Sequence, residues 1–226
     1  MTARTIAIGD IHGCSEALRA LVAAIDPQPA DTIVTLGDYI DRGPDSRGVI
    51  DQILALEKRC RVVPLLGNHE LMLLDALQNP YAVGPWRDCG GDATLASYSS
   101  LPKVPDSHLD FIRRCRRYHE TDSHFFIHAN YQYDVPLDEQ PDYLAFWEHI
   151  YVHLPLWANL SRIAPRPHEN GKIAIVGHTS QKNGEILDLG HVICIDTFCH
   201  GGGCLTALDV GSGKDWQADR HGRLRP

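Results

Sequence analysis

Gly9-Asp10-Ile11-His12-Gly13, Gly37-Asp38-Tyr39-Ile40-Asp41-Arg42-Gly43 and Gly67-Asn68-His69-Glu70 follow one another in the first third of the chain. Each segment comes directly after a short apolar run, namely Thr5–Ile8, Thr32–Leu36 and Arg61–Leu66. Such runs, ended by glycine, predict buried strands. One segment of this kind is weak evidence, but three in order place acidic, amide and imidazole side chains at the ends of three strands. This arrangement decides the fold and the chemistry that the fold can support.

Apolar residues between these strands recur at helical spacing. They predict one helix after Ser15 and a second after Asp45 or Ser46, either of which could cap it. A third helix is expected from near His69 to the residue before Asn79, followed by a loop at 79–91 that is rich in Pro, Gly and Trp. Further helices are expected at 107–117 and 142–153, and further strands at 124–127, 172–176, 192–195 and 204–210. The alternation predicts a layered α/β fold in a single domain, residues 1–226.

The composition and charge of the chain argue against two classes of partner, nucleic acids and membranes. The chain has 226 residues and a formal net charge of -8, which argues against nucleic acid, because counterion release needs a positive protein surface. No apolar run approaches the roughly twenty residues that cross a bilayer, and the first residues lack the apolar region of a signal peptide. We therefore expect a cytoplasmic protein without a membrane partner. The oligomeric state is left open.

The seven cysteines and a group of arginines each allow two interpretations. An odd number of scattered cysteines without a CxxC pair favours reduced thiols, although Cys199, His200 and Cys204 could also bind zinc. The glycines between His200 and Cys204 predict a turn, so these residues are left out of the expected metal site. The arginines are either a solvated helix end or a landing patch for an anionic substrate: Arg113, Arg114, Arg116 and Arg117.

The candidate metal donors share one position in the predicted sheet, because ligands of open α/β sheets bind beyond the carboxyl ends of the strands. The donors at such ends are Asp10, His12, Asp38, Asn68, His69, His128 and His178. Carboxylate, imidazole and amide donors without thiolate suit Mn, Fe, Zn or Co better than Ca or Mg alone. Two such ions about 3.5 to 4 Å apart can share a hydroxide and hold a phosphoryl group. Asp38, on the middle strand, is the expected bridge between them.

The motifs resemble those of the phosphoprotein phosphatase branch of the calcineurin-like metallophosphoesterases, and in style the small bacterial and bacteriophage lambda type protein phosphatases. The resemblance runs from Thr5 to about Val210 and rests on the patterns GDxHG, GDxxDRG, GNHE, a later His-Ala segment and a Gly-His segment. It implies a central β-sandwich flanked by helices, with two divalent ions at one edge and Mn as the first choice before Fe, Zn or Co. One ion would be bound by Asp10, His12 and Asp38, and the second by Asp38, Asn68, His128 and His178.

The same resemblance implies roles for further residues. His69 would be the general acid, oriented by Asp41, while Arg42 and Asn68 would contact phosphate oxygens. Relatives have a Trp-x-Arg whose arginine helps to bind phosphate, but this chain reads Trp147-Glu148-His149. Either His149 takes that place, with weaker or pH-dependent binding, or it is a helix-surface residue. Arg162 or Arg166 could substitute for the missing arginine.

The expected function is a metal-dependent phosphomonoesterase for phosphoserine and phosphothreonine in proteins, with phosphotyrosine left open. A hydroxide that bridges the two metals would attack phosphorus directly, without a phosphoenzyme. One alternative is a symmetrical dinucleoside tetraphosphate hydrolase, which uses the same core motifs, so the substrate is either a phosphoprotein or a small phosphoester. Another is a catalytically silent, metal-dependent binding module, which the presence of the complete motif set disfavours.

Overall fold

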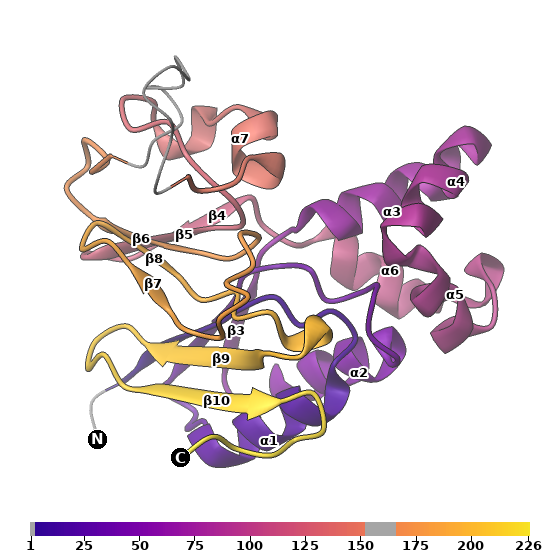
Figure 1. The fold of residues 1–226 in the computed structure, drawn as a ribbon, viewed down its shortest axis with the longest axis horizontal. Helices are drawn as coiled ribbons and strands as arrows, with labels where there is room; N and C mark the ends of the chain where they lie inside the picture. The colour runs from indigo at the N-terminus through magenta and orange to yellow at the C-terminus, as the bar shows by residue number, and fades with distance from the viewer. Residues whose placement is uncertain (1–2, 152–165) are drawn as a thin grey trace.

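The computed structural model describes residues 3–151 and 166–226, in which two five-stranded sheets form a sandwich flanked by helices (Figure 1). The first sheet has the strand order β10-β9-β1-β2-β3 and the second has the order β4-β5-β6-β8-β7. A buried apolar layer between them combines Ala7, Val34 and Val63 of the first sheet with Phe126 and Ile175 of the second. The expected β-sandwich with flanking helices is confirmed.

The first sheet begins with three parallel strands, as the opening motifs predict. These are β1 (Thr5–Ile8), β2 (Thr32–Thr35) and β3 (Arg61–Pro64). The sheet continues with β9 (Cys204–Asp209), which pairs antiparallel with β1, and with β10 (Asp215–Asp219), which pairs antiparallel with β9. The second sheet contains β4 (Tyr118–Glu120), β5 (His124–Ile127), β6 (Ile173–Val176), β7 (Leu187–Asp188) and β8 (Val192–Cys194). Because β5, β6 and β8 are also parallel, both sheets direct several carboxyl ends toward one edge of the sandwich.

Helices cover the outer faces of both sheets. Figure 1 shows α1 (Ser15–Ile25) and α2 (Ser46–Leu56) under the first sheet and α7 (Asp142–Trp147) beside the second. A further group of helices lies at the site-bearing side: α3 (Asn68–Gln78), α4 (Val83–Trp86), α5 (Asp92–Tyr98) and α6 (Asp106–Arg113). The carboxylate of Asp45, not the hydroxyl of Ser46, caps α2 by accepting from the backbone N–H of Gly48 at 2.9 Å. No helix in the described ranges is long and apolar enough to span a membrane.

The loop prediction for residues 79–91 is wrong. A 3₁₀ turn at Pro80–Ala82, helix α4 and a π-helical segment at Arg87–Gly91 fill this stretch. Asn79 caps the first turn by accepting from the Tyr81 N–H, and Pro80 stands at the first helical position, where it lacks no hydrogen bond. Gly90 at φ 115 provides the kink, and the buried indole of Trp86 anchors the segment to the core. Tertiary burial outweighs the local preference of Pro and Gly for loops.

Two helices end earlier than their periodicity predicts. Helix α6 stops at Arg113, because Arg116 instead bonds through its backbone to Pro64 and Leu66 beside β3. Helix α7 stops at Trp147, where the following backbone becomes extended, and residues 152–153 of the predicted helix lie outside the described residues. Short edge strands β4, β7 and β10 were not predicted.

The arginine group behaves as a solvated surface. Arg113 pairs with Asp110 at 3.2 Å, Arg114 pairs with Glu57 at 2.8 Å, and Arg117 pairs with Asp142. Because three of its four charges already face carboxylates, the group offers little free charge to an anionic substrate. The cysteines are all free thiols, as expected.

The Arg4–Asp31 pair fastens the end of the first sheet that lies opposite the motifs. Asp31 accepts from the Arg4 backbone N–H at 2.9 Å and from Arg4 Nη2 at 2.6 Å, while Arg4 also donates to the Ile25 carbonyl that ends α1. Burial acts to raise the pKa of Asp31, but the hydrogen bonds from Arg4 and Gln28 outweigh it and lower the pKa to about 2. One ion pair therefore ties together β1, β2 and α1.

We expect Asp31→Asn to lower the free energy of unfolding at pH 7 by about 1 to 2 kcal/mol, since the amide keeps an acceptor but loses the charge. The folded-state pKa of about 2 lies below the ordinary value of 3.8, so the wild-type advantage is present above pH 3.8 and is lost as the pH falls through 2. Urea unfolding at pH 7, 4 and 2 measures it, with the exposed Asp122→Asn as control. A difference that stays constant down to pH 2 would contradict this assignment.

Candidate metal centre and active site

The predicted donors meet at the edge of the sandwich where β1, β2, β3, β5 and β6 end. Two groups of side chains have ligand atoms within 4.8 Å of one another: His12, Asp38 and His69 form one, and Asp38, His128 and His178 form the other. Asp38 belongs to both groups. Its Oδ2 lies 3.3 Å from His12 Nε2 and its Oδ1 lies 3.5 Å from His128 Nε2. A single buried carboxylate thus has one oxygen facing each half of the site.

The backbone around these side chains is unusually constrained. His12, Asp38, Asp41, Arg42 and His178 all have positive φ, between 44° and 71°. Residues with a Cβ lose roughly 1 to 2 kcal/mol in this conformation, so such turns persist only where other contacts impose them. The strain places five predicted site residues on tight turns at one end of the sheets.

The Glu70 carboxylate supplies much of that constraint. It accepts from the backbone N–H groups of Asp38 and Tyr39, both at 2.8 Å, of Gly67 at 3.1 Å and of Ile40 at 3.3 Å. Glu70 is itself fully buried in the first turn of α3. The loop after β2 is therefore folded around a side chain from the next motif, and its shape depends on that carboxylate.

Two glycines allow the close approach of backbone to ligand that the site requires. A Cβ at Gly67 would lie 2.2 Å from Asp38 Oδ1, and a Cβ at Gly177 would lie 2.0 Å from Asp10 Oδ1. Both distances are far shorter than a van der Waals contact. Any larger residue at either position would displace a carboxylate.

Hydrogen bonds to backbone carbonyls fix the orientation of three imidazoles. His12 Nδ1 donates to the Ile40 carbonyl at 2.9 Å, His128 Nδ1 to Leu36 at 2.7 Å and His178 Nε2 to Trp147 at 3.1 Å. Because a carbonyl oxygen can only accept, each of these nitrogens carries a proton. In the neutral ring the opposite nitrogen is then an unprotonated acceptor directed into the site, which is the form that binds metal.

The ligand atoms that face into the site carry no hydrogen that they could donate, and this observation fits a bound cation. Asn68 Oδ1 lies 3.0 Å from His128 Nε2 and 3.2 Å from His178 Nδ1, so three acceptors face one another. Asp10 Oδ1 is buried without a hydrogen-bond partner in the described structure, while Asp10 Oδ2 accepts from the His178 N–H at 2.9 Å. Burial, with the charges of Asp196 and Asp38, raises the pKa of Asp10 well above its ordinary value. Divalent ions would satisfy these acceptors and neutralise the carboxylates.

His69 is held differently from the other imidazoles. Its Nδ1 donates to Asp41 Oδ2 at 2.7 Å, a buried carboxylate instead of a carbonyl, and its Nε2 lies 4.0 Å from Asp38 Oδ2. Burial lowers the pKa of His69, but the charges of Asp38 and Asp41 outweigh burial and raise it above its ordinary value. A protonated ring is a poor metal ligand and a good proton donor. The carboxylate partner therefore suits His69 to proton donation, whereas the carbonyl partners suit His12, His128 and His178 to metal binding.

Asp41 is oriented in turn by two residues that sequence reasoning missed. Trp86 Nε1 donates to the same Oδ2 at 2.9 Å, and the Thr94 hydroxyl donates to Oδ1 at 2.6 Å. Trp86 comes from the segment predicted as a loop, and Thr94 comes from α5, which directly follows that segment. Trp86 is a buried hydrogen-bond donor as well as a packing residue. Only the fold brings the segment over Asp41, so no local signal could have found this role.

A cavity of about 700 Å³ opens over the site, and Asp38, Asn68 and His178 form part of its floor. Arg42 also lines it, with Nη1 2.9 Å from His12 Nε2 and its backbone N–H bonded to the Gly90 carbonyl at 3.1 Å. His149 lines the opposite part and stacks on His178 with ring centroids 4.6 Å apart. His149 is thus a cavity residue and not a residue of a helix surface.

Of the two arginines considered as substitutes at this position, Arg166 packs over the Tyr133 ring at 5.1 Å and is not among the cavity-lining residues. Arg162 lies outside the described residues. A residue that was left out of the predicted metal site does line the cavity: His200, whose ring contacts that of His12.

Comparisons with known proteins agree with this geometry. Residues 3–203 match the family model described as calcineurin-like phosphoesterase. Serine/threonine-protein phosphatase 1 of Salmonella typhimurium is 33% identical over 213 residues, which cover 90% of each chain. A symmetrical bis(5'-nucleosyl)-tetraphosphatase of Janthinobacterium is 28% identical, covering 91% of this chain and 92% of that one. The solved cold-active protein-tyrosine phosphatase of a psychrophilic Shewanella has a TM-score of 0.67 at 18% identity, covering 99% of this chain and 80% of that one.

We expect Glu70→Gln to lower the free energy of unfolding by about 2 to 3 kcal/mol, because an amide keeps one acceptor oxygen where Glu70 uses both oxygens to accept from four buried N–H groups. Urea unfolding of the metal-free protein measures the effect without a contribution from ion binding. Glu57→Gln serves as the control: its partner Arg114 is half exposed, so the change should stay below about 1 kcal/mol. Equal effects of the two substitutions would show that Glu70 does not hold the loop.

Proposed function

The chain belongs to the calcineurin-like phosphoesterase family, and we propose that it is a metal-dependent phosphomonoesterase acting on phosphoserine and phosphothreonine in proteins. The observation that carries the proposal is the pair of donor groups joined by Asp38, beside an Asp10 oxygen that lacks a partner. A relative named as a serine/threonine phosphatase, matched over 90% of both chains, supports the substrate class. Phosphotyrosine stays open, because the tyrosine phosphatase neighbour at 18% identity shows the fold alone.

We assign the donors to two ions as the motifs predict. Asp10, His12 and Asp38 would hold the first, and Asp38, Asn68, His128 and His178 would hold the second, with Mn as the first choice. When bound, such a pair supplies a nucleophilic water at neutral pH and withdraws charge from the phosphoryl group. The carbonyl partners of His12, His128 and His178 keep those imidazoles in the metal-binding tautomer.

The proton that the leaving oxygen needs is assigned to His69. The Asp41 carboxylate accepts from Nδ1 and so fixes the ring orientation, which places Nε2 4.0 Å from Asp38 Oδ2. The same charge favours the protonated ring, which then releases its Nε2 proton to the departing serine or threonine oxygen. Trp86 and Thr94 prevent Asp41 from rotating away.

The phosphate itself would be held by Arg42, Asn68 and His149. Arg42 provides a planar fork of donors, and its backbone is fixed by the Gly90 carbonyl. His149 is positioned by its stack on His178 and by its own carbonyl, which accepts from Asn130 Nδ2 at 3.1 Å. One imidazole donor supplies less charge and fewer hydrogen bonds than the arginine of relatives, so this part of the site holds phosphate more weakly.

A symmetrical dinucleoside tetraphosphate hydrolase is the second candidate. The match to the tetraphosphatase from Janthinobacterium covers 92% of that protein, and a tetraphosphatase from Acidovorax is 46% identical over 70 residues. High identity over so short a stretch reflects core motifs that both activities use. A catalytically silent binding module is disfavoured, because the fold brings the metal donors, His69–Asp41 and Arg42 together.

We expect the purified protein to hydrolyse a generic aryl phosphate, to lose that activity on chelation and to regain it with Mn. Metal analysis and turnover before and after dialysis measure this. Asp38→Asn should lose both bound ions and activity, because the shared carboxylate contributes to both donor groups. Activity that resists exhaustive chelation would contradict the proposal.

The same Mn-loaded enzyme separates the two substrate classes. Higher kcat/KM on phosphoserine and phosphothreonine peptides than on diadenosine tetraphosphate is the expected result. A preference for the dinucleotide would replace the proposed substrate with the second candidate and leave the metal centre unaffected.

His69→Asn should reduce kcat by about 10² to 10⁴ with the metal content unchanged, because it removes only the proton donor. The loss should be larger for alkyl phosphates than for a nitrophenyl phosphate, whose leaving group departs as a stable anion without protonation. Steady-state kinetics on both substrates, with metal analysis of the variant, measure it. Equal losses on the two substrates would show that His69 does not act as the acid.

A further inference from the structure

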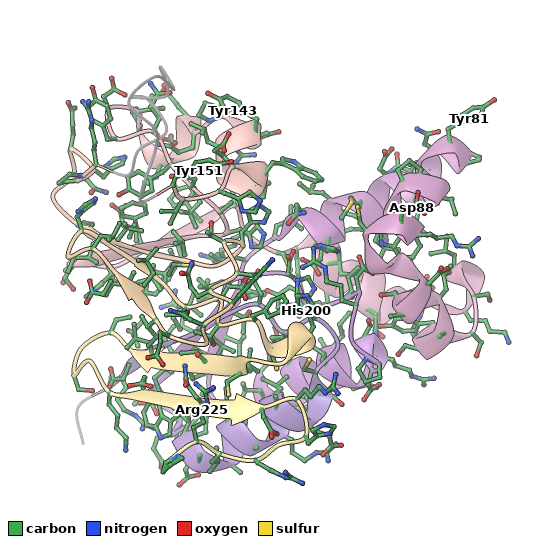
Figure 2. The ribbon with its side chains drawn as sticks, viewed as in Figure 1. Tyr81, Asp88, Tyr143, Tyr151, His200 and Arg225 are labelled. Atoms are coloured by element: carbon green, nitrogen blue, oxygen red, sulfur yellow. The ribbon has the colours of Figure 1, made fainter. Side chains whose placement is uncertain are left out.

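His200 is a cavity residue without an assigned role. It belongs to the 3₁₀ turn Cys199–Gly201 that leads into β9, where Figure 2 labels it. Its ring packs edge to face on His12, with centroids 4.8 Å apart, and on Phe198 at 4.9 Å. Within the described residues these ring contacts are its interactions, with no hydrogen bond to either ring nitrogen. An imidazole beside the metal centre therefore has unused hydrogen-bonding capacity.

The turn that carries His200 is built to a narrow geometry. Phe198 adopts the left-handed conformation at φ 63, and its N–H donates to Asp196 Oδ1 at 3.1 Å. A Cβ at Gly201 would lie 2.0 Å from the Phe198 ring, and a Cβ at Gly203 would lie 1.9 Å from the Thr197 carbonyl oxygen. A strained aromatic residue and glycines without room for a side chain fix where the His200 ring points.

A lysine lies on the same wall of the cavity. Lys182, from the loop between β6 and β7, places Nζ 5.9 Å from the centroid of the Phe198 ring, and both residues line the cavity with His200. In the described parts of the chain Lys182 makes no ion pair, and the acidic side chain that lines the cavity is Asp38. The wall formed by Lys182, Phe198 and His200 thus carries one cation and one imidazole beside an apolar ring, and Trp147 and Tyr151 also line the cavity.

We propose that His200 and Lys182 form a subsite for a second anionic group of the substrate, beside the phosphate that Arg42 binds. This inference rests on the proposed function and extends it to a preference among phosphoesters. The His200 N–H would donate to the anion, and the Lys182 ammonium would supply charge across the apolar Phe198 ring. The second group could be an acidic side chain next to a phosphoserine or the next phosphate of a polyphosphate chain. Both sources present an anionic oxygen close to the scissile phosphate.

The test uses variants that keep packing and remove polarity. His200→Phe retains the ring that packs on His12, and Lys182→Met retains the aliphatic stem over Phe198. Lys214→Met is the matched control, because Lys214 also lies over an aromatic ring, Trp216 at 4.7 Å, and is not among the cavity-lining residues. All are made in the full chain at saturating Mn, in an otherwise wild-type background and in a His69→Asn background.

Two ligand pairs separate the sources of the second anion. The first is a phosphoserine peptide with Asp or with Asn after the phosphoserine, and the second is diadenosine tetraphosphate or adenosine monophosphate. Calorimetric binding to the His69→Asn proteins gives the dissociation constants independently of turnover. Steady-state kinetics in the wild-type background give kcat/KM for each ligand relative to an aryl phosphate.

In one pair or both, we expect the wild-type pocket to favour the more anionic ligand by about three- to tenfold. His200→Phe and Lys182→Met should each remove most of that preference, and Lys214→Met should leave it unchanged. The pair that responds identifies the source of the anion. Equal affinity for both members of both pairs, or losses no larger than that of Lys214→Met, would overturn the subsite. If the wild type hydrolyses no phosphoester, the proposed function fails, while the dissociation constants still decide the subsite.

Discussion

The site depends first on the bonds that the Glu70 carboxylate accepts from four backbone N–H groups. They join the start of α3 to the loop after β2, so two motifs that are thirty residues apart in sequence are folded as one unit. Within this unit Asp38, Asp41 and Arg42 adopt left-handed conformations that sequence alone disfavours. The proposed metal donor, the partner of the proposed acid and the arginine proposed to bind phosphate all lie in this unit, whose loop is held by a single buried side chain.

The second constraint is the burial of several carboxylates at the same place. It makes metal binding and folding depend on each other. Asp10, Asp38 and Asp196 are all nearly inaccessible to solvent, and burial together with the charges of Asp196 and Asp38 raises the pKa of Asp10. Divalent ions bound by the proposed donors would relieve this repulsion only in the folded chain, because the donors come from five separate strand ends. Ion binding would therefore add to the free energy of unfolding.

The sequence predicted the parts of the fold that have strong local signals. The apolar runs before Gly9, Gly37 and Gly67 became β1, β2 and β3, and most of the long helices follow their periodicity. Short edge strands such as β7, with two residues, carry no measurable alternation. The segment at 79–91 was misread because burial of Trp86, a tertiary effect, outweighs its Pro and Gly content. The motif histidines could be found from the GDxHG, GNHE, His-Ala and Gly-His segments, whereas His200 stands in no such motif and meets His12 only in three dimensions.

The metal donors could therefore be predicted from the sequence, whereas the residues of the cavity walls could not. The metal donors lie at strand ends, where the parallel sheets leave little freedom, so motif and position almost determine each other. The walls of the cavity come from separate segments: Trp147 ends α7, Tyr151 follows that helix, Lys182 precedes β7, and His200 precedes β9. Nothing in the local sequence of one loop specifies which side chain from another will face it. In our proposal these walls make the choice among phosphoesters, and on that basis shared core motifs could serve relatives named for different substrates.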